Sequence, residues 1–540
     1  MDHPDPSSQP PRPPRPSPPH TPLAEAMLRE HQSMVTKKGI PIDPPDKGTG
    51  FSRMLAVTLA IVLAGMVIFW QNSSDKTQRL IMNSPPAVAV ELTENDPAPG
   101  AYSQVDIMSR MFIKLRHAMG PESGSSMGMF STMSQIDAWI LSDEDEIRAV
   151  IMSAEFESAE DALDRLDDLE ATLMVEALED FEIADLESSI RELDHFIERD
   201  ISILRTIYAG ESEILDDADR AYIATRYAKL GKVALTHGLS DDHPDRKPLI
   251  TGMGSVVLLE LVVIFGILVL PLTGFILLVL GIVFFASGKL KFATHKPTRG
   301  GSVFLETYAL FIGAFLVMAL AGRYIADHEQ YQHLGVILLP VQWALLTTVF
   351  WGLLRGMNFT RWRHAIGMHS GKGVFREIIC GVIGYLAAIP IFLFGVGIMI
   401  VLLFLQALFA AGSGDAESIV MPSNPILEMI ASGDIVTIVL IFSLATIWAP
   451  LCEELIFRGA LYRHMHGYVH WSLAALGTAV LFAFMHNYGP LFTPPLIALG
   501  FMFAVLRQWR GSLIASMTAH FVHNFSLLTF MVLLVWVIAD

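Results

Sequence analysis

The sequence predicts an all-α protein: a multi-pass transmembrane helical bundle with an N-terminal disordered tail, a single anchor helix and an acidic helical soluble domain. Of the 540 residues, 52% are hydrophobic. They gather in long runs, and about 20 apolar residues span a bilayer as a helix. The net charge of -18 comes from one segment, because residues 141–220 hold 27 Asp and Glu against 6 Lys and Arg. The remainder of the chain is therefore slightly basic.

The first 248 residues divide into three parts. Residues 1–50 are rich in Pro and Ser, a composition that cannot bury a core, and they predict a disordered tail. Residues 54–70 predict a retained transmembrane anchor, since a long tail precedes them and no small-residue cleavage site follows. Residues 71–248 predict an acidic helical soluble domain. The charge of residues 141–220 excludes nucleic acid as a ligand and makes a basic protein a candidate partner.

The apolar runs follow one another closely from residue 249. We expect transmembrane helices over 249–376 and a further membrane domain over 378–537. The runs themselves are 249–270, 273–288, 302–321, 334–354, 378–411, 435–452, 471–487, 494–506 and 512–537.

Loop charge leads to two conflicting orientations. With one crossing per run, the basic loops all fall on one side, which is the cytoplasmic side of most membrane proteins. The same count places residues 71–248 in the cytoplasm and the N-terminal tail outside, although the tail carries Lys37, Lys38, Lys47 and Arg53. One run is therefore misassigned, and the side of the acidic domain stays open. We expect an integral protein of the plasma (inner) membrane in contact with membrane lipid.

Two adjacent carboxylates mark the candidate site. Glu453 and Glu454 directly follow the run 435–452. A carboxylate at bilayer depth costs about 2.5–3.5 kcal/mol, so a functional role is its default explanation. Arg458 lies one helical turn after Glu454 and would neutralise it, which leaves Glu453, about 100° around the helix, free for other work.

The next apolar segments supply imidazoles. One ends in Phe482 and His486, and the last holds His520 and Asn524 on one helix face. A carboxylate can take a proton from water, an imidazole can bind a metal or stabilise an oxyanion, and an amide can donate to that oxyanion. These residue types predict acid–base or metal chemistry inside the membrane.

The three motifs together resemble the CPBP family of intramembrane proteases, which includes the CAAX prenyl endopeptidases and bacteriocin-processing or self-immunity proteins. The family pattern is EExxxR, FxxxH and HxxxN or HxxxD on successive membrane helices. Here it covers roughly residues 378–537, with no departure at the motif positions. Each motif alone is weak, and the order of all three inside apolar segments is what carries the resemblance.

The resemblance implies hydrolysis of a peptide bond by a water molecule that Glu453 activates as general base. His486 and His520 would bind a metal or hold the water and the oxyanion, and Asn524 would stabilise the tetrahedral intermediate. A Zn²⁺ ion on Glu453, His486 and His520 is one form of this site and a metal-free site is the other; the residues leave both open. The supporting residues are Glu454, Arg458 and Phe482.

Two other functions fit the same residues. A catalytically inactive membrane scaffold or immunity protein of the same fold would keep the motifs, and a proton-coupled transporter would use Glu260 and Glu453 as proton relays. For an endopeptidase, the substrate is a peptide or protein near the membrane. Whether it is lipidated, as the prenylated substrates of part of the family are, is not encoded in any motif here.

Overall fold

The computed structural model describes residues 46–72, 104–119, 132–137, 139–140, 142–179, 187–251, 253–326, 328–413, 430, 435–486 and 488–539. Within these ranges the chain forms helices and no strand, and seven helices are long and apolar enough to cross a membrane. The predicted all-α, multi-pass membrane bundle is therefore confirmed. The predicted disordered tail lies outside the described residues up to position 45.

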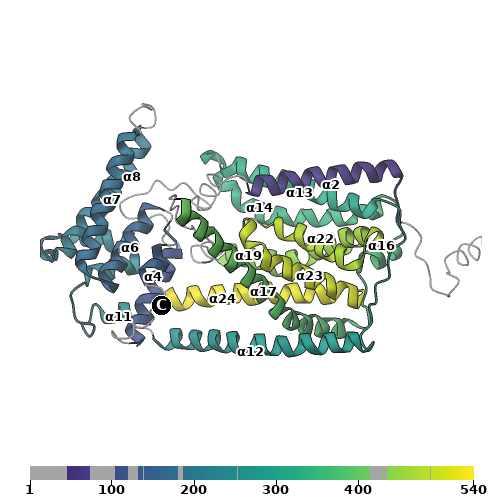
Figure 1. The fold of residues 1–540 in the computed structure, drawn as a ribbon. Helices are drawn as coiled ribbons and strands as arrows, with labels where there is room; N and C mark the ends of the chain where they lie inside the picture. Colours follow the sequence, from purple (N-terminus) through teal and green to yellow (C-terminus); the bar gives the residue numbers. More distant parts are fainter. Residues whose placement is uncertain are drawn as a thin grey trace, which may run out of the picture.

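Helices of up to 22 residues build the soluble domain, which lies at one end of the bundle (Figure 1). At its centre is α6, capped by the Ser142 side chain, which accepts from the Asp145 amide, and buried along residues 147–152. Ile107 and Met111 of α4 pack on Met531 and Leu534 of the last membrane helix. The helices are α4 (Gln104–Met119), α5 (Thr132–Asp137), α6 (Asp143–Phe156), α7 (Ala159–Glu179), α8 (Glu187–Tyr208), η3 (Ser212–Ile214), α9 (Asp217–Arg226), α10 (Ala228–Leu235) and α11 (Lys247–Ile250).

The membrane part is a bundle in which helices distant in sequence lie side by side. Gly381 of α17 allows a close approach to α24, since a Cβ there would lie 2.6 Å from the carbonyl oxygen of Ala515. The helices are α2 (Gly50–Asn72), α12 (Met253–Ala286), α13 (Val303–Ala326), η4 (Glu329–Leu334), α14 (Gly335–Val341), η5 (Gln342–Phe350), α15 (Trp351–Leu354), α16 (Phe359–Ile366), α17 (Val374–Ser413), α19 (Ile435–Ser443), η6 (Leu444–Trp448), α20 (Ala449–Glu453), η7 (Glu454–Leu461), α21 (Tyr462–Tyr468), α22 (Trp471–Phe484), η8 (Pro490–Phe492), α23 (Pro494–Arg510) and α24 (Ile514–Ala539).

The misassigned run is at α12. The runs 249–270 and 273–288, expected as two crossings, form most of one continuous helix that contains Pro271 and crosses once. Only Pro271 and Leu272 separate the runs, without a polar residue to form a turn, and the backbone stays helical through the proline. With one crossing fewer, the parity for residues 71–248 reverses, and the count that the sequence left open now places that domain on the side opposite the basic loops.

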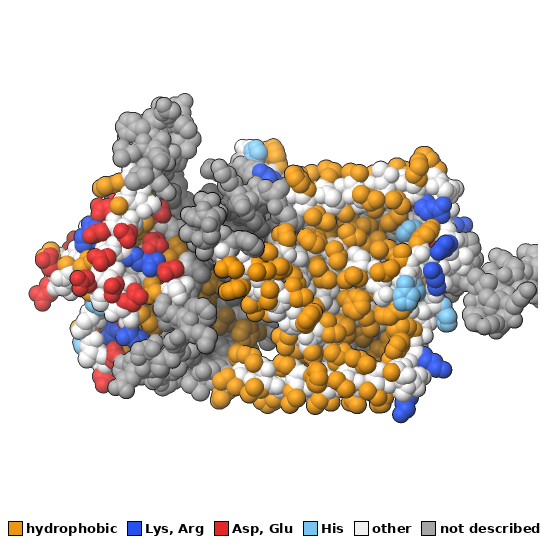
Figure 2. All heavy atoms as spheres, viewed as in Figure 1, with side chains coloured by type: hydrophobic (Ala, Val, Ile, Leu, Met, Phe, Trp, Pro, Cys, Tyr) orange, Lys and Arg blue, Asp and Glu red, His pale blue; other side chains and the backbone are white. Residues whose placement is uncertain are grey.

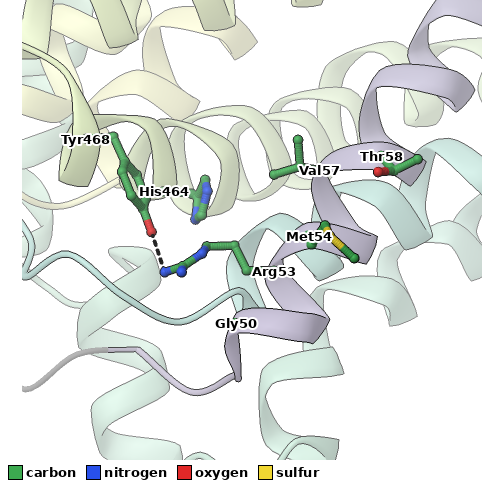
Figure 3. Close-up of a pocket in the computed structure, with 7 residues that line it drawn as sticks. All are labelled: Gly50, Arg53, Met54, Val57, Thr58, His464 and Tyr468. Carbon is green, nitrogen blue, oxygen red and sulfur yellow. Dashed lines mark hydrogen bonds between the residues drawn. The ribbon is translucent and has the colours of Figure 1, made fainter.

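The chain segments at the other end of the bundle form what we call the basic face: residues 46–53, 287–302, 355–373, 463–470 and 507–513. Hydrogen bonds tie these segments together. Asp46 accepts from Arg463, Arg53 donates to Tyr468 (Figure 3), and the Thr294 hydroxyl donates to the Arg507 carbonyl. Lys and Arg side chains gather at this end, whereas Asp and Glu gather on the soluble domain at the opposite end (Figure 2). The start of α2 and the residues directly before it therefore lie at the same end of the bundle as the basic loops.

The revised count predicts that the soluble domain and the basic face lie on opposite sides of the membrane, with the basic face in the cytoplasm. In a protein whose Cys380 and Cys452 are replaced by Ala, a cysteine at the exposed position of Glu213 is expected to react with a membrane-impermeant maleimide on intact cells. A cysteine at the exposed position of Lys291 is expected to react only after permeabilisation. Equal labelling of both in intact cells would contradict this arrangement.

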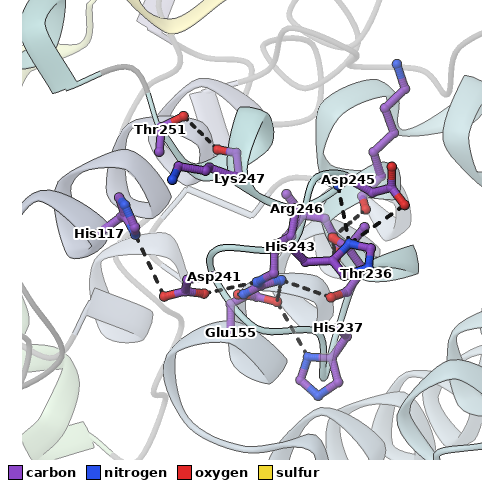
Figure 4. Close-up of polar contacts among 12 residues, drawn as sticks. His117, Glu155, Thr236, His237, Asp241, His243, Asp245, Arg246, Lys247 and Thr251 are labelled. Carbon is purple, nitrogen blue, oxygen red and sulfur yellow. Dashed lines mark hydrogen bonds and ion pairs between the residues drawn. The ribbon is translucent and has the colours of Figure 1, made fainter.

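Glu155 at the end of α6 connects the soluble domain to the chain that enters α12. Its carboxylate accepts from Arg246 at 2.6 Å and lies 3.5 Å from Nδ1 of His237 (Figure 4). Arg246 precedes α11, and its Nε also donates to Asp241. Burial alone would raise the pKa of Glu155, but the hydrogen bonds from His237 and Arg246 outweigh burial, so the pKa lies below its usual value of 4.5.

Glu155→Gln is expected to lower the free energy of unfolding by about 1.5–3 kcal/mol near pH 7, because it removes hydrogen bonds to a buried charge. A carboxyl with a lowered folded-state pKa stabilises the protein above pH 4.5, its usual value, and that stability is lost as pH falls through the folded pKa. The difference between variant and wild type should therefore shrink below pH 4.5. Thermal unfolding in detergent measures the difference in stability at each pH. Glu160→Gln, at an exposed position, is the control. A difference that does not depend on pH would contradict the lowered pKa of Glu155.

Candidate active site

The helix that carries the carboxylates runs without a break from α19 to α21 and contains two π-helical segments, η6 and η7. In η6 the Ala449 amide donates to Leu444, a spacing of five residues. At that spacing the next carbonyl, Ala445, would require an amide hydrogen from Pro450, which has none. Asn524 of α24 supplies it, since its Nδ2 donates to the Ala445 oxygen at 2.7 Å. Pro450 thus leaves the Ala445 carbonyl without a donor in its own helix, and the hydrogen bond from Asn524 to this carbonyl holds α24 against the helix.

The two carboxylates differ sharply in their surroundings. Glu454 is fully buried, and its Oε1 accepts from Arg458 at 2.8 Å. The side chain of Glu453 is 16% exposed, and within the described ranges its Oε2 is buried and accepts no hydrogen bond. Oε2 of Glu454 also accepts no hydrogen bond among the described residues, but this side chain is closed to solvent and paired with Arg458. Glu453 is therefore the carboxylate that a bound molecule can reach.

His520 of α24 lies between the two carboxylates. Its Nδ1 is 3.3 Å from Oε1 of Glu454, and its Nε2 is 3.8 Å from Oε2 of Glu453. Glu454, ionised beside Arg458, can only accept, so Nδ1 of His520 carries the hydrogen of that contact. Phe503 of α23 stacks on the imidazole with ring centroids 5.0 Å apart. The ring is thus fixed with Nε2 toward Glu453.

His486 lies in the turn after α22. Its Nδ1 is 2.9 Å from the Phe482 carbonyl oxygen, which accepts only, so Nδ1 is the donor and Nε2 is left as an acceptor. The Phe482 ring contacts both histidines, with ring centroids 4.8 Å from His486 and 6.0 Å from His520. Among the residues the structure describes, no hydrogen bond joins His486 to Glu453 or His520. The structure brings Glu453, His520 and Glu454 into direct proximity, and His486 shares with His520 the contact to Phe482.

Arg458 is fully enclosed. Its guanidinium lies 4.3 Å from the Phe482 ring centroid and 5.3 Å from that of Phe503, and its Nη2 donates to the Gly500 carbonyl at 3.1 Å. A Cβ at Gly500 would lie only 3.1 Å from that Nη2 and from the Ala479 backbone. The glycine is therefore needed for α23 to approach this close.

Sequence reasoning missed three positions that shape the site: Phe503, Gly500 and Ala445. All three lie in the apolar runs between or before the motifs, where a phenylalanine, a glycine or an alanine is unremarkable in sequence. The π-helical shift at Ala445 had one sequence signal, Pro450. Glu260, which the transporter hypothesis uses, has its side chain outside the described residues.

The predicted zinc ligands were tested against the geometry. Within the described ranges no three His, Cys, Asp or Glu residues are grouped to hold a metal ion. Nδ1 of His486 and Nδ1 of His520 contact the Phe482 carbonyl and Glu454, so each imidazole has only its Nε2 left for a metal ion. As placed, Glu453, His486 and His520 do not fit a zinc site, and the metal stays a prediction.

The site lies within the membrane, nearer to the basic face. His520 follows the start of α24 at Ile514 by six residues, about 9 Å along the helix. The neighbouring α22 and α23 have 14 and 17 residues, so they extend roughly 21–26 Å from the basic face, less than the ~30 Å hydrocarbon core. The turn that holds His486 therefore ends inside the membrane.

The comparisons with known proteins agree with the motifs. A family model described as Rce1-like, type II CAAX prenyl endopeptidase, matches residues 435–526, a range narrower than the predicted 378–537 that still contains every residue of the three motifs. No curated protein and no solved structure matches the chain. Residues 435–526 therefore form an Rce1-like domain, the domain type described for the type II CAAX prenyl endopeptidases.

Proposed function

We propose that the protein is a glutamate-dependent intramembrane endopeptidase. The observation that carries the proposal is the contrast between the neighbouring carboxylates. Glu454 is closed to solvent and paired with Arg458, whereas Glu453 is 16% exposed and pairs with no Lys or Arg among the described residues, and its Oε2 lies 3.8 Å from Nε2 of His520. A general base needs a carboxylate that a water molecule can reach, and Glu453 meets this condition.

In the first step, Glu453 takes a proton from water as the water oxygen bonds to the carbonyl carbon of the peptide. His486 can hold the second water hydrogen, because its Nε2 is an acceptor. Nε2 of His520, when protonated, and the second Nδ2 hydrogen of Asn524 can donate to the oxyanion. Glu453 then delivers its proton to the amine nitrogen as the C–N bond breaks. No metal enters these steps.

Glu454 and Arg458 are positioning residues in this proposal. Their ion pair is closed to solvent, and Glu454 holds the imidazole of His520 by Nδ1. Phe482 is also a positioning residue, because its ring packs against both His486 and His520. A contact of Glu454 or Arg458 with a substrate terminus would require this buried pair to open.

The depth of the site favours a peptide that enters the leaflet next to the basic face. A peptide or protein held at the membrane by a lipid or by an apolar segment fits that depth. We propose the plasma (inner) membrane as the location, which cell fractionation tests.

The test is hydrolysis of fluorogenic and membrane-anchored peptides by the purified full-length protein in detergent. Cleavage that His520→Ala abolishes supports the proposal. No cleavage of any peptide, with unchanged binding, would favour the inactive scaffold or immunity protein. Uptake driven by a pH gradient in liposomes, without cleavage, would favour the transporter. Elemental analysis and activity after chelation decide whether zinc takes part.

A further inference from the structure

A cavity of about 490 Å³ opens at the basic face between the start of α2 and α21. It is well away from Glu453, and α2 lies outside the residues that the family model matches. Its lining comprises Gly50, Arg53, Met54, Val57, Thr58, His464 and Tyr468 (Figure 3). The cavity is an open recess at the border of the membrane and the aqueous phase.

The polar end of this recess is cationic. Nη1 of Arg53 donates to the Tyr468 hydroxyl at 3.1 Å, and the imidazole of His464 lies beside Tyr468, with ring centroids 5.1 Å apart. Arg53 forms no ion pair among the residues that the structure describes, so its remaining N–H groups are available. The lining contains no carboxylate, and the nearby Asp46 is engaged with Arg463.

The other end of the recess is apolar and continues into the membrane. Met54 and Val57 are 63% and 39% exposed, and Ile61, one turn further on the same face of α2, is 68% exposed. A Cβ at Gly50 would meet nothing within 4 Å, so the recess is open at the helix start. An arginine next to an apolar strip that leads toward the bilayer centre matches a phosphate attached to acyl chains.

From this geometry we propose a binding site for one anionic phospholipid. Its phosphate accepts hydrogen bonds from Arg53 and from His464 when that imidazole donates, and an acyl chain lies along Met54, Val57 and Ile61. The absence of a carboxylate from the lining disfavours the ammonium group of a zwitterionic headgroup. Since α21 continues the helix that carries Glu453, the bound lipid would join α2 to the catalytic helix.

The test counts lipids bound to the full-length protein by native mass spectrometry, with added phosphatidylglycerol, phosphatidylcholine or inorganic phosphate. We expect one tightly retained phosphatidylglycerol, and a roughly tenfold or greater loss of its affinity in Arg53→Gln, since a charge-assisted hydrogen bond is lost. Arg376→Gln, an exposed arginine on the same side without a described contact, is the charge-matched control and should bind as the wild type does.

A second pair of variants leaves every charge in place. Gly50→Leu is expected to fill the recess and weaken binding, whereas Gly65→Leu, also on α2 and also with open space around its Cβ, should not. Equal loss in Arg53→Gln and Arg376→Gln would show unspecific attraction to the basic face and overturn the proposal. So would displacement of the lipid by inorganic phosphate or equal retention of phosphatidylcholine.

Discussion

Glu453→Gln is expected to reduce peptide hydrolysis by roughly 10²–10⁴-fold, the range that general acid–base catalysis contributes. Gln keeps the size of the side chain but cannot take a proton. Since Oε2 of Glu453 accepts no hydrogen bond among the described residues, the amide breaks no hydrogen bond there and changes only the 3.8 Å contact with His520. The thermal unfolding temperature should therefore stay close to that of the wild type, and kcat should fall more than KM changes.

Glu454→Gln is the matched comparison, because it makes the same chemical change one residue away. It should lower both the unfolding temperature and activity, since Arg458 and His520 lose their ionised partner. Equal activity of Glu453→Gln and wild type on the same peptide would exclude Glu453 as the base. A Glu453→Gln protein that unfolds as readily as Glu454→Gln would show that both carboxylates are structural.

The second large effect is on stability. Arg458→Met is expected to destabilise the protein by about 3–5 kcal/mol, because it leaves the Glu454 carboxylate buried without its cation. Met retains much of the packing against Phe482 and Phe503, so lost volume contributes little. Unfolding in mixed micelles, followed by circular dichroism, measures the change.

Two further variants separate charge from packing. In the double variant Glu454→Gln with Arg458→Met, the unpaired charge is gone, so its loss of stability should be smaller than the sum of the single losses. Arg355→Met removes an arginine that is 37% exposed from its pair with Glu306, whose carboxylate keeps the hydrogen bonds from Ser302 and Trp351, and it should cost about 1 kcal/mol or less. An additive double variant would mean that the buried pair contributes no coupling.

The motif residues themselves were recognisable from sequence because each is costly in a membrane. A carboxylate, an arginine or a histidine within an apolar run stands out from its neighbours, and its spacing predicts the helix face. The i,i+4 spacing also predicted that Glu454, and not Glu453, pairs with Arg458. The structure contains that ion pair.

The topology could not be counted from apolar runs. An apolar stretch interrupted by Pro271 has the composition of two short helices, yet α12 continues through the proline. Its length is set by the partners along the whole helix, which include α17, α24 and α4. Whether α12 crosses once or twice decides on which side of the membrane every segment before it is counted.

The sequence by itself determined the class of the protein, its membrane segments and the residues that carry chemistry, because hydropathy and unpaired charge are local properties. Only the tertiary structure decided which side each domain takes and how the groups meet. It brought Phe503, Gly500 and the Ala445 carbonyl to the site and kept the three proposed metal ligands from forming a cluster. These outcomes depend on how helices pack, and packing joins atoms that the order of residues does not place together.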